Sequence, residues 1–352
     1  MKGGEFSTRI IAWQKRHGRR DLPWQNTRDP YRIWLSEIML QQTQVATVIP
    51  YFARFLEKFP TLCDLARASE DEVLALWSGL GYYSRGRNLL RAAQIVAEKF
   101  RGEFPKGMDD ILALPGVGQS TAAAISAFAF GERQAILDGN VKRVFARQFG
   151  VAGFPGEKKI ETKLWSVSNE ALPKKNIESY TQGLMDLGAT VCLRTRPLCL
   201  ACPVEESCIA KREGRIKELP TPRPRKAVPE KSSTMLIIAH AGEVLLEKRP
   251  PTGVWAGMWC FPELINGASP RDVCRDRYGL ETKPLKPWGV LQHGFTHFKL
   301  SITPQPITVQ KKLARAAEPG VMWLSIEDAL AAAIPKPVRE LLIKLDQRNR
   351  SS

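Results

Sequence analysis

The stretch that decides the fold is residues 111–143, which read Ile111-Leu-Ala-Leu-Pro-Gly-Val-Gly-Gln-Ser-Thr-Ala-Ala-Ala-Ile125, then a helical run, then Ala135-Ile-Leu-Asp-Gly-Asn-Val-Lys-Arg143. Apolar residues at helical spacing stop at Pro115, and an alanine-rich helix begins at Ser120 or Thr121. Between them Gly116 and Gly118 predict a tight hairpin, so the stretch is a helix-hairpin-helix. Backbone N–H groups at such glycines can approach an anion closely, which favours a nucleic-acid phosphate. An ordinary helical corner is the alternative.

Asp138 ends the short apolar run that follows the second helix, and Gly139 begins a new amphipathic helix. Asp138 is therefore predicted to be an N-cap, a role that typically stabilises a helix by about 1 kcal/mol. It has a functional alternative. The helix N–H groups and the positive helix end would keep this carboxylate ionised beside a phosphate-binding hairpin.

Glu37 lies on the apolar face of a helix predicted from Asp29-Pro30 to about Val48. A buried carboxylate is costly, so Glu37 is either paired in the core or protonated in a pocket that raises its pKa. The polar run Gln41–Gln44 beside it favours a pocket for a polar ligand.

Composition and charge place limits on the class of protein. A chain of 352 residues predicts two domains or three packed lobes. The net charge of +16 is spread evenly on both sides of residue 216, which favours DNA or RNA over a membrane as the partner. Neither a transmembrane run nor a signal-like N-terminus is found, so we expect a cytoplasmic, nucleoid-associated protein.

Four of the seven cysteines are clustered, namely Cys192, Cys199, Cys202 and Cys208. An odd total with such a cluster argues against a disulfide framework and for a metal-binding loop in a reducing compartment. The spacing leaves zinc and an iron–sulfur cluster both open, because only one pair has the two-residue gap common in zinc sites.

A proline-rich basic linker is predicted at residues 216–231, and the periodicity changes beyond it. Strands are expected at Met235–Ala239, Val244–Arg249, Trp288–Leu291 and Phe298–Thr303, and helices at Pro270–Tyr278, Ser325–Ala333 and Val338–Asp346. An all-α half, residues 1–215, thus precedes an α+β half, residues 232–346.

The sequence resembles the MutY family of adenine DNA glycosylases, within the endonuclease III superfamily. The motifs that carry the resemblance are Trp34-Leu-Ser-Glu-Ile-Met-Leu-Gln-Gln-Thr-Gln-Val45, Gly79-Leu-Gly-Tyr-Tyr83, Leu114-Pro-Gly-Val-Gly118, Ile136-Leu-Asp-Gly-Asn-Val-Lys-Arg143, the four cysteines and Phe295-Thr-His-Phe298.

This resemblance implies an all-α helix-hairpin-helix glycosylase core, residues 30–134, and an iron–sulfur cluster lobe, residues 1–29 plus 135–215. A Nudix-like domain follows the linker. It further implies a four-iron four-sulfur (4Fe–4S) cluster on Cys192, Cys199, Cys202 and Cys208. The implied substrate is double-stranded DNA with adenine mispaired with 8-oxoguanine or guanine, bound by a monomer.

The two carboxyls suit such chemistry on their own account. Breaking an N-glycosidic bond needs an acid at the leaving base and a negative charge near the oxocarbenium-like sugar. We expect Glu37 to be the acid and Asp138 the stabiliser, with pKa values set apart by their surroundings. The resemblance adds Asn140 as a residue that holds the site. Gln42 and Tyr82 are expected to fill or wedge the duplex when the adenine leaves the stack.

Ser120 stands where strand-cleaving relatives carry a lysine nucleophile, so we predict a glycosylase without efficient lyase activity. Lys142 is interpreted as a phosphate contact, together with Gly116, Gly118 and Ser120 in the hairpin motif.

The C-terminal half matches the start of a Nudix box at Gly253–Glu263 but lacks the acidic pair that would hold magnesium. Nucleotide hydrolysis is therefore not expected, and we predict that Phe295, Thr296 and His297 recognise the 8-oxoguanine. Alternatively these residues only close a strand edge. A non-enzymatic iron–sulfur DNA-binding protein is the rival class, but it would not need Glu37 and Asp138 together.

Overall fold

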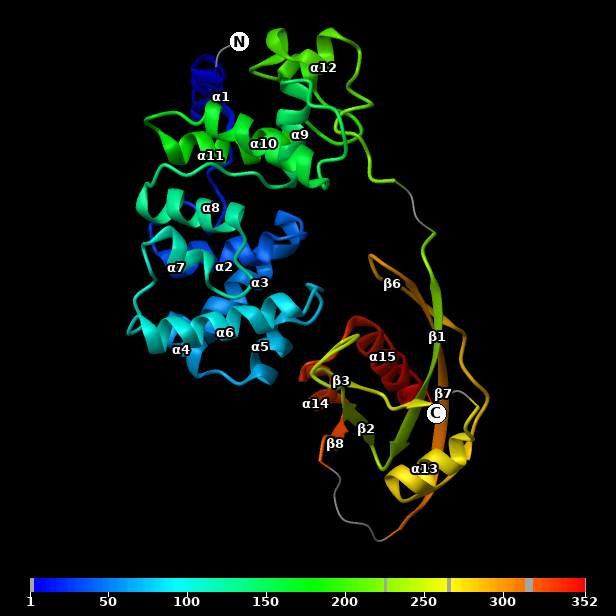
Figure 1. Ribbon diagram of the computed structural model, residues 1–352. Coiled ribbons are helices and arrows are strands. Elements are labelled where there is room, and N and C mark those ends of the chain that lie inside the picture. Colours follow the sequence, from blue (N-terminus) through cyan, green and yellow to red (C-terminus); the bar gives the residue numbers. More distant parts are fainter. Residues whose placement is uncertain (1–2, 225–226, 265–266, 314–318, 352) are drawn as a thin grey trace. The chain divides into compact units, whose positions relative to one another are not determined.

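The computed structural model describes residues 3–224, 227–264, 267–313 and 319–351. The chain forms two compact units, Met1–Arg67 with Arg91–Arg225 and Ala68–Leu90 with Lys226–Ser352. Each unit is described by itself below, with the labels of Figure 1.

The first unit is helical throughout its described residues. Its helices are α1 (Gly3–His17), α2 (Pro30–Leu40), α3 (Val45–Lys58), α4 (Leu62–Arg67), most of α6 (Ser84–Lys99), α7 (Met108–Leu112), α8 (Gln119–Phe130), α9 (Gly139–Gln148), α10 (Lys158–Ala171), α11 (Ile177–Asp186) and α12 (Ile209–Arg212). A π-turn η1 (Leu187–Val191) and the 3-10 turns η2 (Cys199–Ala201) and η3 (Glu205–Ser207) surround the clustered cysteines.

The first helix packs with helices from far along the chain. α1 lies against α10 and α11, at the end of the first unit that also holds α9 and α12 (Figure 1). Phe6 of α1 is fully buried, and its ring contacts Phe145 at 5.9 Å and Tyr180 at 6.5 Å between ring centroids. This aromatic cluster joins the N-terminus to the part of the chain that carries Asp138.

The helix predicted from Asp29 to Val48 is two helices, which corrects the sequence prediction. Asp29 caps α2 as expected, but α2 ends at Leu40 and α3 begins at Val45. Gln42 adopts a left-handed backbone with φ of +58°. The break lets Gln41 Nε2 donate to the carbonyl of Gly116 and to Thr121 Oγ1, both at 3.2 Å. Two separate polar bonds thus tie the α2–α3 turn to the hairpin.

The helix-hairpin-helix itself is confirmed. α7 leads into the turn, where Gly116 has φ of +80°, and Gly118 is the N-cap of α8. Because Gly118 has no side chain, no capping side chain covers the first N–H groups of α8. The hairpin therefore presents a helix N-terminus without a side-chain cap, the arrangement that suits anion binding.

The second unit is built on a mixed sheet. Its strands are β1 (Glu230–His240), β2 (Glu243–Lys248), β3 (Trp259–Cys260), β4 (Glu263–Leu264), β5 (Leu280–Pro284), β6 (Leu291–Gly294), β7 (Lys299–Lys312) and β8 (Val321–Ser325), and its further helices are α5 (Glu70–Trp77), α13 (Pro270–Tyr278), α14 (Ile326–Ala331) and α15 (Lys336–Ser351). The path runs β3-β2-β1-β7-β5, and β1 and β7 are parallel.

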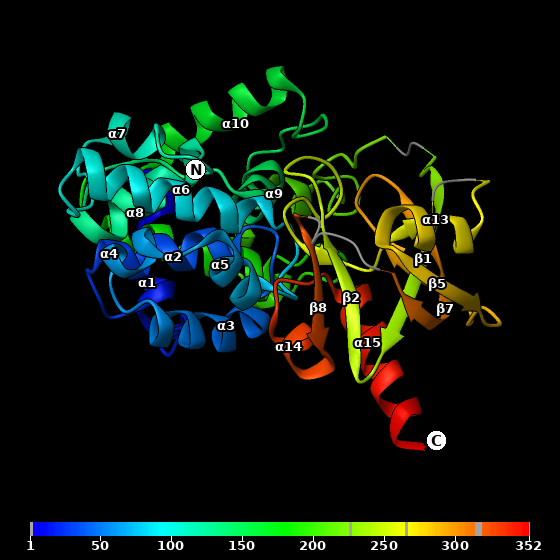
Figure 2. The same cartoon turned by 90° about the horizontal axis from the view of Figure 1, so that it is seen from below.

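Alternate residues of β1 face two different cores, as a strand's period of two requires. Met235 and Ile237 pack with the cluster that includes α14 and α15. Leu236 and Ile238 pack with the cluster that includes α13 and β5. The sheet is thus covered on both faces (Figure 2).

The α+β architecture of the C-terminal half is confirmed, with differences in detail. β3, β4, β5 and β8 were not predicted, and the strand expected from Trp288 begins only at Leu291. β1 starts at Glu230, inside the predicted linker. In the described part of the chain, no helix is both long enough and apolar enough to cross a membrane.

Residues 68–90 pack with the C-terminal sheet, although the sequence analysis placed them in the helical half. Leu74 of α5 is fully buried in the same core as Met235 and Met258. Lys248 of β2 forms an ion pair with Asp71 at 2.7 Å, and Ser78 Oγ donates to the carbonyl of Ile334 at 2.7 Å. Apolar and polar contacts therefore both join this segment to the second unit.

Candidate active site

A cavity of about 700 Å³ lies in the first unit, next to the face of α2 that carries Glu37. This volume lies within the range of small-molecule sites, about 300–1,000 Å³. Trp24 and Arg28 line it from the segment before α2, and Glu178 and Gln182 line it from α11. Arg28 and Glu178 form an ion pair. The cavity thus offers an aromatic face and several hydrogen-bonding groups, none of which the sequence analysis identified.

Glu37 is one of two half-buried carboxyls that line this cavity, and the other, Glu178, is the one paired with Arg28. Burial, together with the negative charge of Asp138, raises the pKa of Glu37 from 4.5 to about 8. Glu37 thus lines a cavity, one of the two alternatives that the sequence left open, and the raised pKa favours its protonated form near neutral pH. At pH 7 this carboxyl can donate a proton to a bound group.

Asp138 is the N-cap of α9, as predicted, and its Oδ1 accepts the Val141 N–H at 2.7 Å. The surroundings of Asp138 act on its pKa in opposite directions. Burial raises the pKa of Asp138, whereas the N–H groups of Val141 and Asn140 and the charges of Arg143 and Lys142 lower it without cancelling the effect of burial. The helix end therefore moderates the cost of this buried charge but does not abolish it.

The pair still has an asymmetry. Asp138 has backbone donors and two cationic neighbours, while the causes found for Glu37 are burial and the charge of Asp138, both of which favour its protonated form. The N–H groups and cations beside Asp138 favour its ionised form, and no such donor is among the causes at Glu37. The geometry thus supports one acid and one carboxylate.

Asn140 lies in the first turn of α9 and packs against the π-turn η1. Its Oδ1 accepts from Arg143 Nη2 at 2.9 Å, and the same guanidinium donates to the carbonyls of Gly188 at 2.6 Å and Cys192 at 2.7 Å. A Cβ on Gly188 would lie 2.5 Å from the Cβ of Asn140, so a larger residue there would displace it. Arg143 links the start of α9 to the cysteine loop.

Two predicted DNA contacts have partners inside the protein. Ser120 Oγ accepts the backbone N–H of Leu137 at 3.0 Å, which fixes the residue before Asp138 against α8. Lys142 Nζ forms an ion pair with Glu161 at 2.6 Å. Ser120 thus supports the site from within, and a phosphate would compete with Glu161 for Lys142.

The two predicted wedge residues are exposed and carry backbone strain. Gln42 has φ of +58° in the α2–α3 turn. Tyr82, in the second unit, is 41% exposed and has φ of +49°. Non-glycine residues held in this conformation cost roughly 1–3 kcal/mol, and such strain is common at ligand-binding sites.

The four clustered cysteines line one small cavity of about 30 Å³, beside Arg147. None of them forms a disulfide, and Arg147 Nη1 lies 3.4 Å from Cys192 Sγ. Burial, helped by the other three thiols, raises the pKa of Cys202 to about 12. Within the described residues, no three metal-binding side chains are close enough to coordinate one ion. Four thiols around one cavity nevertheless fit a thiolate-ligated group, whose positive charge would allow them to ionise.

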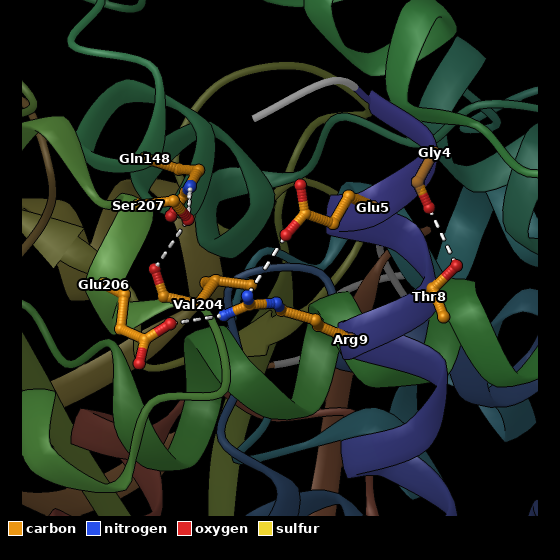
Figure 3. Close-up of polar contacts among 8 residues, drawn as sticks. All are labelled: Gly4, Glu5, Thr8, Arg9, Gln148, Val204, Glu206 and Ser207. Carbon is orange, nitrogen blue, oxygen red and sulfur yellow. Dashed lines mark hydrogen bonds and ion pairs between the residues drawn. The ribbon is translucent and has the colours of Figure 1, made fainter.

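Polar contacts fasten the loop that leads to Cys208 (Figure 3). Arg9 of α1 donates to Glu5 at 3.1 Å and to Glu206 of η3 at 3.0 Å. Gln148 of α9 donates to Ser207 Oγ at 2.9 Å, immediately before Cys208. Helices α1 and α9 thus both hold this loop in place.

The residues predicted to recognise 8-oxoguanine, Phe295 to His297, form the hairpin turn between β6 and β7, called the reading hairpin below. In this turn the Phe295 N–H donates to the carbonyl of Phe298 at 2.8 Å. The Phe295 ring stacks on Phe298 at 4.4 Å and contacts Trp255 at 5.6 Å. Thr296 and His297 are exposed at the tip. The hairpin therefore presents the Thr296 hydroxyl and the His297 imidazole to solvent. The Phe295 ring belongs to the aromatic cluster that supports them.

Comparison with known proteins gives the class first. Residues 35–170 match the family described as "HhH-GPD superfamily base excision DNA repair protein", and residues 233–344 match the NUDIX domain family. A thermostable thymine-DNA glycosylase structure is similar over 60% of this chain and 97% of its own, with 30% identity and a TM-score of 0.55. An endonuclease III–DNA complex covers 61% of this chain and 98% of its own, with 22% identity and a TM-score of 0.52, and shares the fold. The chain is a base-excision DNA glycosylase.

Curated relatives give the particular family. An adenine DNA glycosylase of Buchnera aphidicola subsp. Acyrthosiphon pisum (strain APS) is 36% identical over 338 residues, 96% of each chain. The adenine DNA glycosylase of Homo sapiens is 32% identical over 96% of this chain and 73% of its own. The chain belongs to the adenine DNA glycosylases, which act on DNA in base excision repair.

Proposed function

We propose that the enzyme removes adenine paired with 8-oxoguanine or guanine, with Glu37 as the general acid and Asp138 as the stabilising carboxylate. The observation that carries this proposal is the pairing of a cavity carboxyl of pKa about 8 with a second carboxyl that has its own donors.

Each residue has one task in the reaction. The adenine leaves the base stack and enters the cavity, because its glycosidic bond is inaccessible inside the duplex. Glu37 protonates the leaving base, and the negative charge of Asp138 stabilises the sugar cation until water adds to it. The proton that this water loses passes to the Glu37 carboxylate and restores the acid. Asn140, held by Arg143, keeps the start of α9 in position.

Glu37→Gln and Asp138→Asn should each abolish excision while duplex affinity stays near that of wild type, since phosphate contacts supply most of the affinity. The assay uses a duplex with one adenine opposite 8-oxoguanine under single-turnover conditions, followed by alkali to reveal abasic sites. Turnover by the Glu37 variant within a few-fold of wild type would remove the acid role from Glu37.

DNA contacts are proposed at the hairpin N–H groups near Gly116 and Gly118, with Gln42 and Tyr82 as the residues that enter the duplex. Support comes from the uncapped start of α8 and from the exposed, strained backbone of both wedge residues. Because the substrate is DNA, we infer that the enzyme acts at the nucleoid.

The cofactor proposed is a 4Fe–4S cluster held by Cys192, Cys199, Cys202 and Cys208. Such a cluster would cross-link the loop around its sulfur ligands and give the thiolates a positive centre to bind. Arg147 and Arg143 donate to the backbone of the same loop, at Leu193 and Cys192, and so orient the thiols.

Recognition of 8-oxoguanine is proposed for the β6–β7 hairpin, where Thr296 and His297 are the exposed groups. We define the 8-oxoguanine preference as the ratio of single-turnover rates opposite 8-oxoguanine and opposite guanine. Thr296→Ala should lower this preference about tenfold, since one good base contact gives roughly 1–3 kcal/mol of discrimination. Point variants are the suitable test, because removing the C-terminal domain would expose Leu74 and leave Asp71 without Lys248.

A further inference from the structure

Arg85 of α6 joins the loop that carries Tyr82 to the end of α5. The guanidinium of Arg85 lies 5.7 Å from the Tyr82 ring centroid and 5.4 Å from that of Trp77, and it donates to the carbonyl of Gly81 at 3.2 Å. A Cβ on Gly86 would lie 3.2 Å from the Trp77 ring. The Tyr82 turn, α5 and the first turn of α6 therefore move together.

Arg87 joins this assembly to a loop of the Nudix-like half. Its Nη1 donates to the carbonyl of Ala256 at 2.6 Å, and both partners belong to the second unit. Arg87 is half-buried and Ala256 is 3% exposed. A charge-assisted bond to a buried carbonyl is among the stronger hydrogen bonds in a protein.

The Ala256 loop is in turn packed against the reading hairpin. Trp255, the preceding residue, is 6% exposed and has φ of +53°. Its ring contacts Phe295 at 5.6 Å and His293 at 5.7 Å between centroids. A displacement of the hairpin that moves Phe295 must therefore move Trp255 or open a gap in a close-packed core.

We propose that Arg87 is a positioning residue that couples recognition of the opposite base at the Thr296 hairpin to the placement of Tyr82 in the duplex. The path runs from Phe295 to Trp255, through the adjacent Ala256 carbonyl to Arg87, and so to the Tyr82 turn. This inference rests on the proposed function, in which the hairpin reads 8-oxoguanine and Tyr82 enters the duplex. In consequence, 8-oxoguanine preference depends on a residue that need not touch the base.

Replacing Arg87 should break the proposed coupling without detaching residues 68–90, because other contacts keep this segment on the second unit. Asp71 remains paired with Lys248, Ser78 remains bonded to Ile334, and Leu74 remains in the core. We therefore expect Arg87→Ala to fold. Arg91→Ala is the matched control, since Arg91 lies one turn further along α6, is exposed and carries the same charge.

The test is a double-mutant cycle on the 8-oxoguanine preference, in the full-length protein at one salt concentration. Arg87→Ala should lower the preference by about threefold to tenfold, as expected for a coupling residue remote from the base. In the Thr296→Ala background it should lower the preference no further. Arg87→Lys, which keeps a donor for the Ala256 carbonyl, should restore part of the preference, and Arg91→Ala should leave it unchanged.

Two outcomes would overturn the coupling. Arg87→Ala could slow both substrates equally with a smaller salt dependence, which would make Arg87 a phosphate contact. Alternatively, the effects of Arg87→Ala and Thr296→Ala on the preference could multiply, which would make them independent. If Thr296→Ala and Phe295→Ala both leave the preference at the wild-type value, the proposed reading function itself fails, and this result is distinct from either of the other two.

Discussion

Replacing Glu37 by Gln should make the folded protein more stable at alkaline pH, although it removes the proposed catalytic acid. Burial and the charge of Asp138 raise the pKa of Glu37 from 4.5 to about 8. Between these two pH values the folded chain holds a proton on Glu37 that the unfolded chain has released. The free energy of unfolding of the wild type therefore falls as the pH rises through this interval.

The size of the effect follows from the same two values. At about 1.4 kcal/mol for each tenfold change in proton affinity, a pKa that moves from 4.5 to about 8 corresponds to a loss of up to about 5 kcal/mol above pH 8. A Gln side chain carries no charge at any pH and escapes this loss. Glu37→Gln should thus match the wild type near pH 5 and exceed its stability by several kcal/mol near pH 9.

Urea unfolding at a series of pH values between 5 and 9 measures this difference. Glu57→Gln is the control, because Glu57 lies on α3 in the same unit and is exposed to solvent. In parallel, the single-turnover rate of the wild type should fall tenfold per pH unit above about 8, since the acid has then lost its proton. A stability difference that is the same at pH 5 and pH 9 would falsify the assignment of a protonated Glu37.

Three further predictions concern other parts of the first unit. Purified anaerobically, the protein should be brown and contain about four irons per chain, whereas zinc without iron would overturn the cluster proposal. Ser120→Lys should form a borohydride-trappable adduct and cleave DNA strands. It should also lower the free energy of unfolding by about 1–3 kcal/mol, because the Leu137 N–H loses its acceptor. Strong strand cleavage by the wild type would contradict the prediction of a glycosylase without efficient lyase activity. Gly118→Ala should fold normally, since its Cβ meets nothing within 4 Å, yet bind duplex more weakly, whereas Gly116→Ala should also be unstable because φ is +80°.

The sequence could predict those features of the site that depend only on residues close by along the chain. The cap at Asp138 depends on residues within one helical turn, and the apolar face of Glu37 on helical spacing, so both were found. The cavity wall could not be found in this way. Gln182 and Glu178 reach the cavity from α11, about 140 residues after Glu37, and only tertiary packing brings them there.

The errors in the predicted fold have physical causes of the same kind. The run from Asp29 to Val48 has helical periodicity throughout, and the break at Gln42 goes with a bond of the neighbouring Gln41 to the hairpin at Gly116. Likewise, α5 reads as one more amphipathic helix, and nothing local indicates that Leu74 packs with Met235. In both places a long-range contact outweighs a local preference.

The asymmetry between the two carboxyls comes from hydrogen bonding and charge, because burial acts on both in the same direction. Burial raises the pKa of Glu37 and of Asp138 alike, so a site built by desolvation alone would hold two neutral acids. The Val141 N–H and the guanidinium of Arg143 oppose burial at Asp138. In the proposed mechanism the start of α9 therefore favours the ionised form at Asp138, and Ser120 holds the neighbouring Leu137 N–H without touching either carboxyl.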